Sequence, residues 1–191
     1  MKLKAALASL AAVCAAPAMA GVTVIDFDSM LTNVHVLNYY AASQGVTFQN
    51  FITATGTAAS SDPRYAYMNG PNGYINVAGG FNGFNFGYGT LAPATIKVYS
   101  GLNGTGTLLG STPLSGNAME FAFSSVAFAG IGHSVVLSGQ SNYAALDDVT
   151  FTLSPPPVPE PHSWAMLLAG LAVTGFAVRR GLSRHGTVPR S

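Results

Sequence analysis

TIKVY, residues 95–99, alternates apolar and polar side chains with a period of two. Successive side chains of an extended strand point to opposite faces, so Ile96 and Val98 would share one face of such a strand. The same alternation recurs in FNFGY at residues 84–88 and in VTFTL at residues 149–153. The three stretches therefore predict β-strands that each bury one face.

Further strands are expected where short apolar runs lie between turn signals such as Asn-Gly and Ser-Gly-Asn. These candidates are Val22–Phe27, Val46–Phe51, Gly73–Val77, Met119–Phe123 and Ser134–Leu137. Residues 21–154 contain no sustained helical stripe of apolar side chains. Strands spaced by roughly 8–12 residues are typical of sandwiches and barrels. We therefore expect an all-β chain whose residues 21–154 form a single β-sandwich or jelly-roll domain.

The N-terminal segment, residues 1–20, has the three parts of a secretory signal peptide. A lysine-bearing start is followed by an apolar Ala/Leu stretch and by Ala18-Met19-Ala20, an A-x-A cleavage site. We expect signal peptidase and the export machinery to be partners, with cleavage after Ala20. Cys14 is the only cysteine and would leave with this peptide. The mature protein would then have neither a disulfide nor a thiol nucleophile.

The charge of the expected domain differs from that of the whole chain. Between residues 21 and 154 the only cations are Arg64 and Lys97, and six acidic residues oppose them, which leaves a net charge of −4. Binding of nucleic acids requires cations that neutralise phosphates. An acidic exported domain therefore excludes nucleic acid as a partner.

The C-terminal segment begins with a proline-rich linker, residues 155–163, and continues with an uncharged apolar run, residues 164–178. Fifteen helical residues span about 22 Å, which is less than the roughly 30 Å of a bilayer core. A helix that starts near Pro161 and lets Arg179 and Arg180 snorkel closes most of this gap. The arginines then mark the cytoplasmic side. We expect a single transmembrane helix over 164–178 and a basic cytoplasmic tail over 179–191.

The C-terminal segment contains, in this order, Val158-Pro159-Glu160-Pro161, the apolar run and the arginine cluster. It resembles the PEP-CTERM sorting signal of exported bacterial proteins. The resemblance covers about residues 158–184, and the tail runs somewhat past the family's usual end. It implies that a membrane-embedded exosortase recognises Pro159, Glu160 and Pro161 and processes the tail, with Arg179 and Arg180 as the membrane stop. It also implies a Gram-negative-type host that makes exopolysaccharide. The protein would pass through an inner-membrane-anchored intermediate to the cell surface or the extracellular space.

Two acidic clusters lie near the two ends of the expected domain. Asp26 and Asp28 are near its start, and Asp147 and Asp148 open its last strand. Chain termini of a domain often lie close together, so the four carboxylates would converge. Ca²⁺ is bound by hard oxygen ligands of this kind. Structural calcium, with these four aspartates as ligands, and solvated aspartates in turns both remain open. No other cofactor is expected.

The exported domain also resembles the galactose-binding-type jelly rolls of PEP-CTERM proteins, at IDFDSM, TIKVYSGLNGTGTLLGS and NYAALDDVTF. These motifs are loose and extend over most of the domain. They imply a fold more than an activity.

Catalytic constellations are absent from the sequence, and we expect no catalytic residues and no enzyme activity. Asp147 and Asp148 are adjacent, so on a regular strand they would point to opposite faces and could not act as an opposed acid/base pair. The chain also has no G-x-S-x-G nucleophile elbow. A glycoside hydrolase is therefore only a distant alternative.

Glycan binding is a stronger alternative. Tyr65 and Tyr67 lie in a Pro/Gly/Asn-rich region that we expect to be an exposed loop, where aromatic rings can serve as platforms for sugars. Tyrosine is also ordinary strand material. The leading hypothesis is a non-enzymatic structural or adhesive protein of an extracellular matrix or biofilm. The alternative is a carbohydrate-binding module that recognises exopolysaccharide.

Overall fold

The computed structural model describes residues 21–56, 61, 63–154, 167–168 and 170–172. Contacts divide the chain into a compact unit of residues 19–156 and a second unit made of residues 1–18 and 157–191. In the second unit, residues 167–168 and 170–172 are helical. Among the described residues no helix combines the length and apolarity needed to cross a membrane. Most of the span expected at 164–178 lies outside the described residues.

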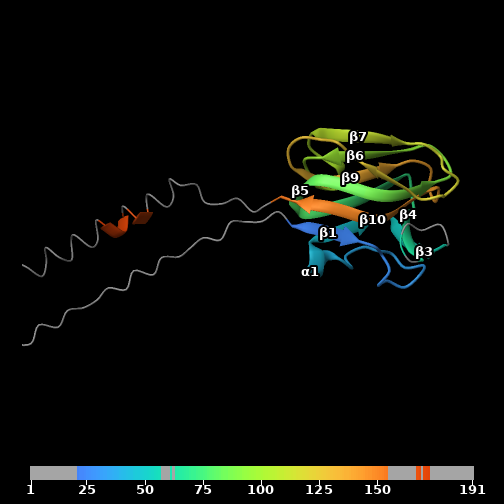
Figure 1. Ribbon diagram of the computed structural model, residues 1–191, viewed down its shortest axis with the longest axis horizontal. Helices are drawn as coiled ribbons and strands as arrows, with labels where there is room; N and C mark the ends of the chain where they lie inside the picture. The colour runs from blue at the N-terminus through green and yellow to red at the C-terminus, as the bar shows by residue number, and fades with distance from the viewer. Residues whose placement is uncertain (1–20, 57–60, 62, 155–166, 169, 173–191) are drawn as a thin grey trace, which may run out of the picture. The chain divides into compact units, whose positions relative to one another are not determined.

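The first unit is an all-β structure with one short α-helix and one 3-10 turn (Figure 1). The elements are β1 (Val22–Ile25), α1 (Ala41–Gln44), β2 (Val46–Gln49), β3 (Phe51–Thr55), β4 (Arg64–Met68), β5 (Asn72–Thr90), β6 (Ala94–Tyr99), η1 (Leu102–Gly104), β7 (Leu108–Leu114), β8 (Ala122–Ser125), β9 (Gly132–Ser138) and β10 (Ala144–Leu153). The described strands follow the order β3-β4-β10-β5-β9-β6-β7, with β1 on β10 and with β2 and β8 on β5.

The 19-residue strand β5 connects two groups of strands. Its first part pairs with β2 and β9, and its second part pairs with β10 and β8. The register to β9 shifts between Asn76 and Phe81, where Gly80 has a φ of +74°. This conformation suits glycine because it has no Cβ. The resulting arrangement is consistent with the β-sandwich that the sequence predicts.

The core confirms the alternation seen in the sequence. Phe84 and Phe86 are buried, and Tyr88 packs against the same core. The rings of Phe84 and Phe151 lie 5.1 Å apart between centroids, which joins β5 to β10. Ile96 is also fully buried on β6, whereas Lys97 on the opposite face is half-buried. Period-two patterning therefore identified the inward faces of three strands correctly.

Several expected boundaries were wrong. The strands expected at 73–77 and 84–88 belong to the single strand β5, and the strand expected at Val22–Phe27 ends at Ile25. Backbone conformation explains two further differences. The expected strand Val46–Phe51 is divided into β2 and β3 at Asn50, whose φ is +61°. Strand β8 begins at residue 122 and not at Met119, which itself has a φ of +65°. Another difference concerns Tyr65-Ala66-Tyr67, which was expected to lie in a loop and belongs to the strand β4.

Burial of Tyr40 makes the stability of the fold depend on pH. Its side chain is 4% exposed beside Phe27 and Phe48, and this burial raises the pKa of Tyr40 from 10.0 to about 12. The unfolded chain therefore ionises first as the pH rises above 10. Stability should be fully present below pH 10 and fall by at most about 2–3 kcal/mol by pH 12.

Urea unfolding at pH 9 and pH 11 measures this effect. The variant Tyr40→Phe has no group to ionise and should show a smaller difference between the two pH values. An equal difference in both proteins would exclude Tyr40 as the cause.

Candidate functional site

Tyr65 and Tyr67 lie on the outward face of β4, two residues apart. The residues that alternate with them, Ala66 and Met68, are fully buried in the core. Pro63 precedes this strand and an Asn-Gly-Pro turn follows it. The Pro, Gly and Asn residues that suggested a loop therefore lie at the two ends of the strand and not within it. The two tyrosines are thus held by a regular strand, and both are half-buried.

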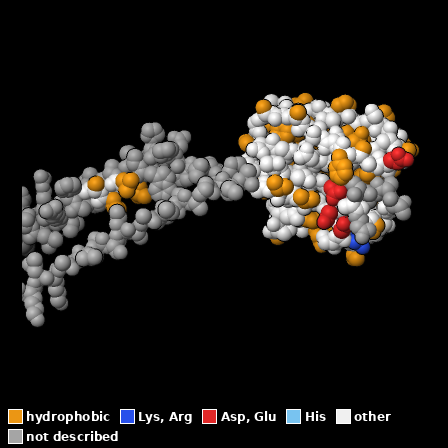
Figure 2. Space-filling model, viewed as in Figure 1, with side chains coloured by type: hydrophobic (Ala, Val, Ile, Leu, Met, Phe, Trp, Pro, Cys, Tyr) orange, Lys and Arg blue, Asp and Glu red, His pale blue; other side chains and the backbone are white. Residues whose placement is uncertain are grey.

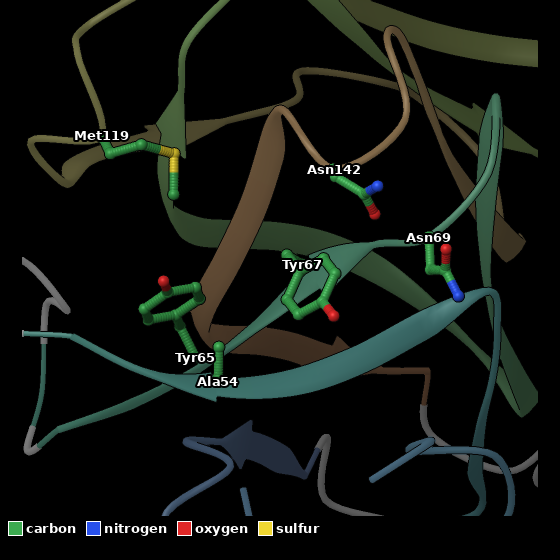
Figure 3. A pocket seen from close by; sticks show the side chains of 6 residues that line it. All are labelled: Ala54, Tyr65, Tyr67, Asn69, Met119 and Asn142. Carbon is green, nitrogen blue, oxygen red and sulfur yellow. The ribbon is translucent and has the colours of Figure 1, made fainter. Parts of the chain in front are cut away.

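A pocket of about 400 Å³ lies over these two rings (Figure 3). Its lining residues are Ala54, Tyr65, Tyr67, Asn69, Met119 and Asn142. In Figure 3 Tyr67 lies between Tyr65 on one side and the two asparagines on the other. Met119 lies across from Tyr65 and Ala54. The volume is at the small end of the range for small-molecule sites.

The connections between strands supply the other polar and apolar walls. Asn69 directly follows β4, and Asn142 lies in the connection from β9 to β10. The backbone N–H of Asn142 donates to the carbonyl of Met68 over 2.8 Å, which fastens that connection to the end of β4. Asn142 has a φ of +64°, a conformation that asparagine tolerates better than most residues. The two carboxamides are therefore held beside the two phenol rings.

Met119 reaches the pocket from an anchored connection between β7 and β8. The side-chain oxygen of Asn117 accepts a hydrogen bond from the backbone of Thr90 over 2.7 Å, and its Nδ2 donates to the carbonyl of Tyr88 over 3.2 Å. Ala118 and Met119 both have positive φ values, +55° and +65°. Such conformations are unfavourable for residues with a Cβ and recur where function requires them.

Phe121 forms the support behind the pocket. Its ring lies 5.5 Å from that of Tyr65 and rests over Gly89 on β5. A Cβ on Gly89 would come within 2.9 Å of this ring. The ring can therefore occupy this position only because residue 89 has no side chain.

The lining chemistry combines two aromatic faces with phenol and carboxamide groups, and none of the six side chains is charged. Phenols and carboxamides both donate and accept hydrogen bonds, as sugar hydroxyls do. From the sequence we proposed Tyr65 and Tyr67 as glycan-binding residues but did not propose Asn69, Met119 and Asn142. These three residues lie in connections that are distant in sequence and meet only in the folded chain. The alternation Tyr-Ala-Tyr-Met was a signal that β4 is a strand.

The two acidic clusters lie at neighbouring strands, as expected. β1 pairs with β10 so that Ile25 is opposite Val149, which places Asp26 next to the position of Asp148. Figure 2 shows acidic side chains gathered in the region of β1, β10 and β4, beside a basic one. Asp26 is exposed and Asp28 is half-buried.

A β-bulge changes the expected geometry of the second cluster. The register to β5 shifts between Asp147 and Thr150, and Asp148 has a φ of +47°. Asp147 is fully buried, and its Oδ2 accepts hydrogen bonds from the N–H and hydroxyl of Ser61 over 3.0 and 3.3 Å. The two aspartates therefore do not simply alternate across a regular strand. In the described ranges no three His, Cys, Asp or Glu side chains gather as metal ligands, and the calcium site stays a prediction.

The described ranges do not reach the residues expected to direct export and sorting. These are Ala18, Ala20, Pro159, Glu160, Pro161, Arg179 and Arg180.

A comparison with family models covers most of the sorting residues. Residues 157–181 match the PEP-CTERM protein-sorting motif. The matched range contains the Pro-Glu-Pro triplet and both arginines, so the chain carries this motif, as the sequence predicted. No curated protein matches the chain significantly in sequence.

Several solved structures resemble the chain at low identity. One is a glycoside hydrolase family 43 arabinoxylan arabinofuranohydrolase from Bacillus subtilis (20% identity, 55% of this chain and 24% of that chain, TM-score 0.41). Another is a family 6 carbohydrate-binding module from Clostridium stercorarium in complex with cellobiose (13%, 69% and 94%, TM-score 0.39). A third is a mutant of a family 29 carbohydrate-binding module (14%, 75% and 99%, TM-score 0.46). The chain thus spans about a quarter of the arabinofuranohydrolase. At these levels the similarities carry no argument about function.

Proposed function

We propose that residues 21–154 form a carbohydrate-binding domain, with its ligand in the pocket over Tyr65 and Tyr67. The pocket is the observation that carries this proposal, because it places two aromatic rings and two carboxamides around one solvent-facing cavity. The positive φ of Met119, a residue that lines this cavity, adds support, because such conformations recur at ligand-binding sites. The alternative hypothesis from the sequence is therefore favoured over the leading one.

The expected ligand is an uncharged saccharide. None of the six lining side chains carries a charge that could neutralise a carboxylate or a sulfate. The cations within residues 21–154 are Arg64 and Lys97. Arg64 lies on the face of β4 opposite to Tyr65, where its Nη1 donates to the carbonyl of Asp28, and Lys97 lies on β6. An anionic sugar would therefore gain no partner in this pocket.

The sorting motif indicates where in the cell this binding would take place. In our proposal the protein is exported, held in the inner membrane by the segment at 164–178, processed by an exosortase and delivered to the cell surface. Binding of exopolysaccharide there would retain it in an extracellular matrix. The protein would act without catalysis, as a non-enzymatic adhesive component.

A glycan array tests the binding directly. The probes are neutral β-glucans, xylans, mannans and galactans, each beside a uronic-acid or sulfated counterpart. We expect saturable binding of at least one neutral glycan by the full-length protein. The variant Tyr67→Ala should bind about tenfold or more weakly, since truncating a central aromatic contact typically removes at least about 1.4 kcal/mol.

Tyr39→Ala is the matched control, because Tyr39 is a 52% exposed tyrosine in the connection between β1 and β2 and does not line the pocket. Its binding should equal that of the unmodified protein. Absence of binding to every probe, or an equal loss in both variants, would overturn the proposed function.

A further inference from the structure

Phe123 is an exposed aromatic residue that the pocket does not include. It lies on β8 and is 71% exposed, the second most exposed of the large hydrophobic side chains among the described residues. A single exposed apolar side chain is common on protein surfaces. The position of Phe123 relative to the pocket is what makes it informative.

The strand register places Phe123 on the same face as the two tyrosines. Tyr67 on β4 is opposite Ala145 on β10, which is opposite Gly89 on β5. Phe123 is opposite Gly87, two residues before Gly89 on the same strand. Because directly paired residues of antiparallel strands share a face, all of these positions face outward together.

Phe121 lies between the tyrosines on β4 and Phe123 on β8. Its ring lies over Gly89 and is 5.5 Å from that of Tyr65, and Phe123 follows it by two residues. The outward face thus carries a strip of four aromatic rings, Tyr67, Tyr65, Phe121 and Phe123, which we call the aromatic strip. Between β4 and β8 lie two strands, so the strip extends over three strand spacings, about 14 Å.

The residues of β5 below the strip have no side chains to obstruct it. Gly87 and Gly89 are the outward positions of β5 between β10 and β8. A ligand longer than the pocket can therefore continue over Phe121 without meeting a protruding side chain of β5. A span of this length exceeds what one sugar ring covers.

We propose that Phe123 is a second contact site for the ligand, and that the ligand is an extended oligosaccharide or polysaccharide chain that runs from the pocket along the aromatic strip. This proposal rests on the proposed function, because it extends the same site. It assigns the ligand to chains of several sugar units, and it makes Phe123 a residue that selects for chain length.

Calorimetric titration of the full-length protein tests this assignment. The probes are the mono-, di-, tetra- and hexasaccharides of β-1,4-glucan, β-1,3-glucan, β-1,4-xylan and β-1,4-mannan. For a series that binds, we expect the affinity to rise at least tenfold from the disaccharide to the tetra- or hexasaccharide. Phe123→Ala should remove most of that rise and leave the affinity for the disaccharide unchanged.

Leu108→Ala is the control, because Leu108 is 49% exposed on β7, whose ladder partner is β6 and not β4 or β8. It should keep the full dependence on chain length. Affinity that is independent of length, or a length dependence that survives in Phe123→Ala, would overturn the assignment while leaving the pocket in place. Absence of binding in every series and to every probe of the glycan array would instead remove the proposed function itself.

Discussion

Replacing Phe84 with alanine should destabilise the domain by about 3–5 kcal/mol. Phe84 is 1% exposed, and its ring contacts those of Phe86 at 5.0 Å and Phe151 at 5.1 Å between centroids. Truncation removes the buried ring and leaves a cavity where β5 meets β10. Because domains are typically stable by only 5–15 kcal/mol, a large part of the total stability should be lost.

Urea unfolding followed by tyrosine fluorescence or circular dichroism measures this loss. Phe123→Ala provides the matched control, since it makes the same substitution at a side chain that is 71% exposed. It should change the free energy of unfolding by no more than about 0.5 kcal/mol. Similar losses in the two variants would mean that Phe84 is not a core residue of the folded protein.

The strand faces could be predicted because alternation reports burial directly. Ile96 and Phe151 are buried as their patterns required, and no knowledge of the neighbouring strands was needed for this conclusion. The closeness of the first and last strands followed from the usual position of domain termini, and the pairing of β1 with β10 bears it out. These inferences use short-range patterns or a general property of domains.

The length of β5 could not be predicted in this way. Its sequence contains glycines such as Gly79 and Gly80, which weaken a strand and suggest a break. The chain continues through them because the two halves of β5 pair with different strands. Pairing partners are a property of the tertiary structure, and local propensity does not report them.

The pocket was only half visible in the sequence for a related reason. Tyr65 and Tyr67 attract attention as neighbouring aromatic residues, whereas Asn69, Met119 and Asn142 are ordinary loop residues in three separate connections. Their convergence depends on the position of β4 beside β10 and on the anchoring of the β7–β8 connection. The β-bulge at Asp148 could not be predicted either, because nothing in the sequence marks where one strand carries an extra residue.

Gly89→Leu should abolish ligand binding while the fold survives. A Cβ at this position would lie 2.9 Å from the ring of Phe121 and 3.3 Å from the Cα of Met119. The larger side chain must displace Phe121 from Tyr65 and move Met119, so the support and one wall of the pocket are lost together. Overpacking of this kind typically destabilises a domain by about 1–3 kcal/mol, which is less than the loss expected for Phe84→Ala.

Gly79→Leu isolates the effect of the pocket, because it makes the same substitution on the same strand at a position where a Cβ would meet no atom within 4 Å. It should bind glycans as the unmodified protein does. Binding by Gly89→Leu is to be measured on the glycan array together with its urea midpoint, so that a folded but non-binding protein can be recognised. If Gly89→Leu remains folded and binds normally, the ligand does not occupy the pocket over Tyr65 and Tyr67, because this substitution cannot leave the ring of Phe121 where it is.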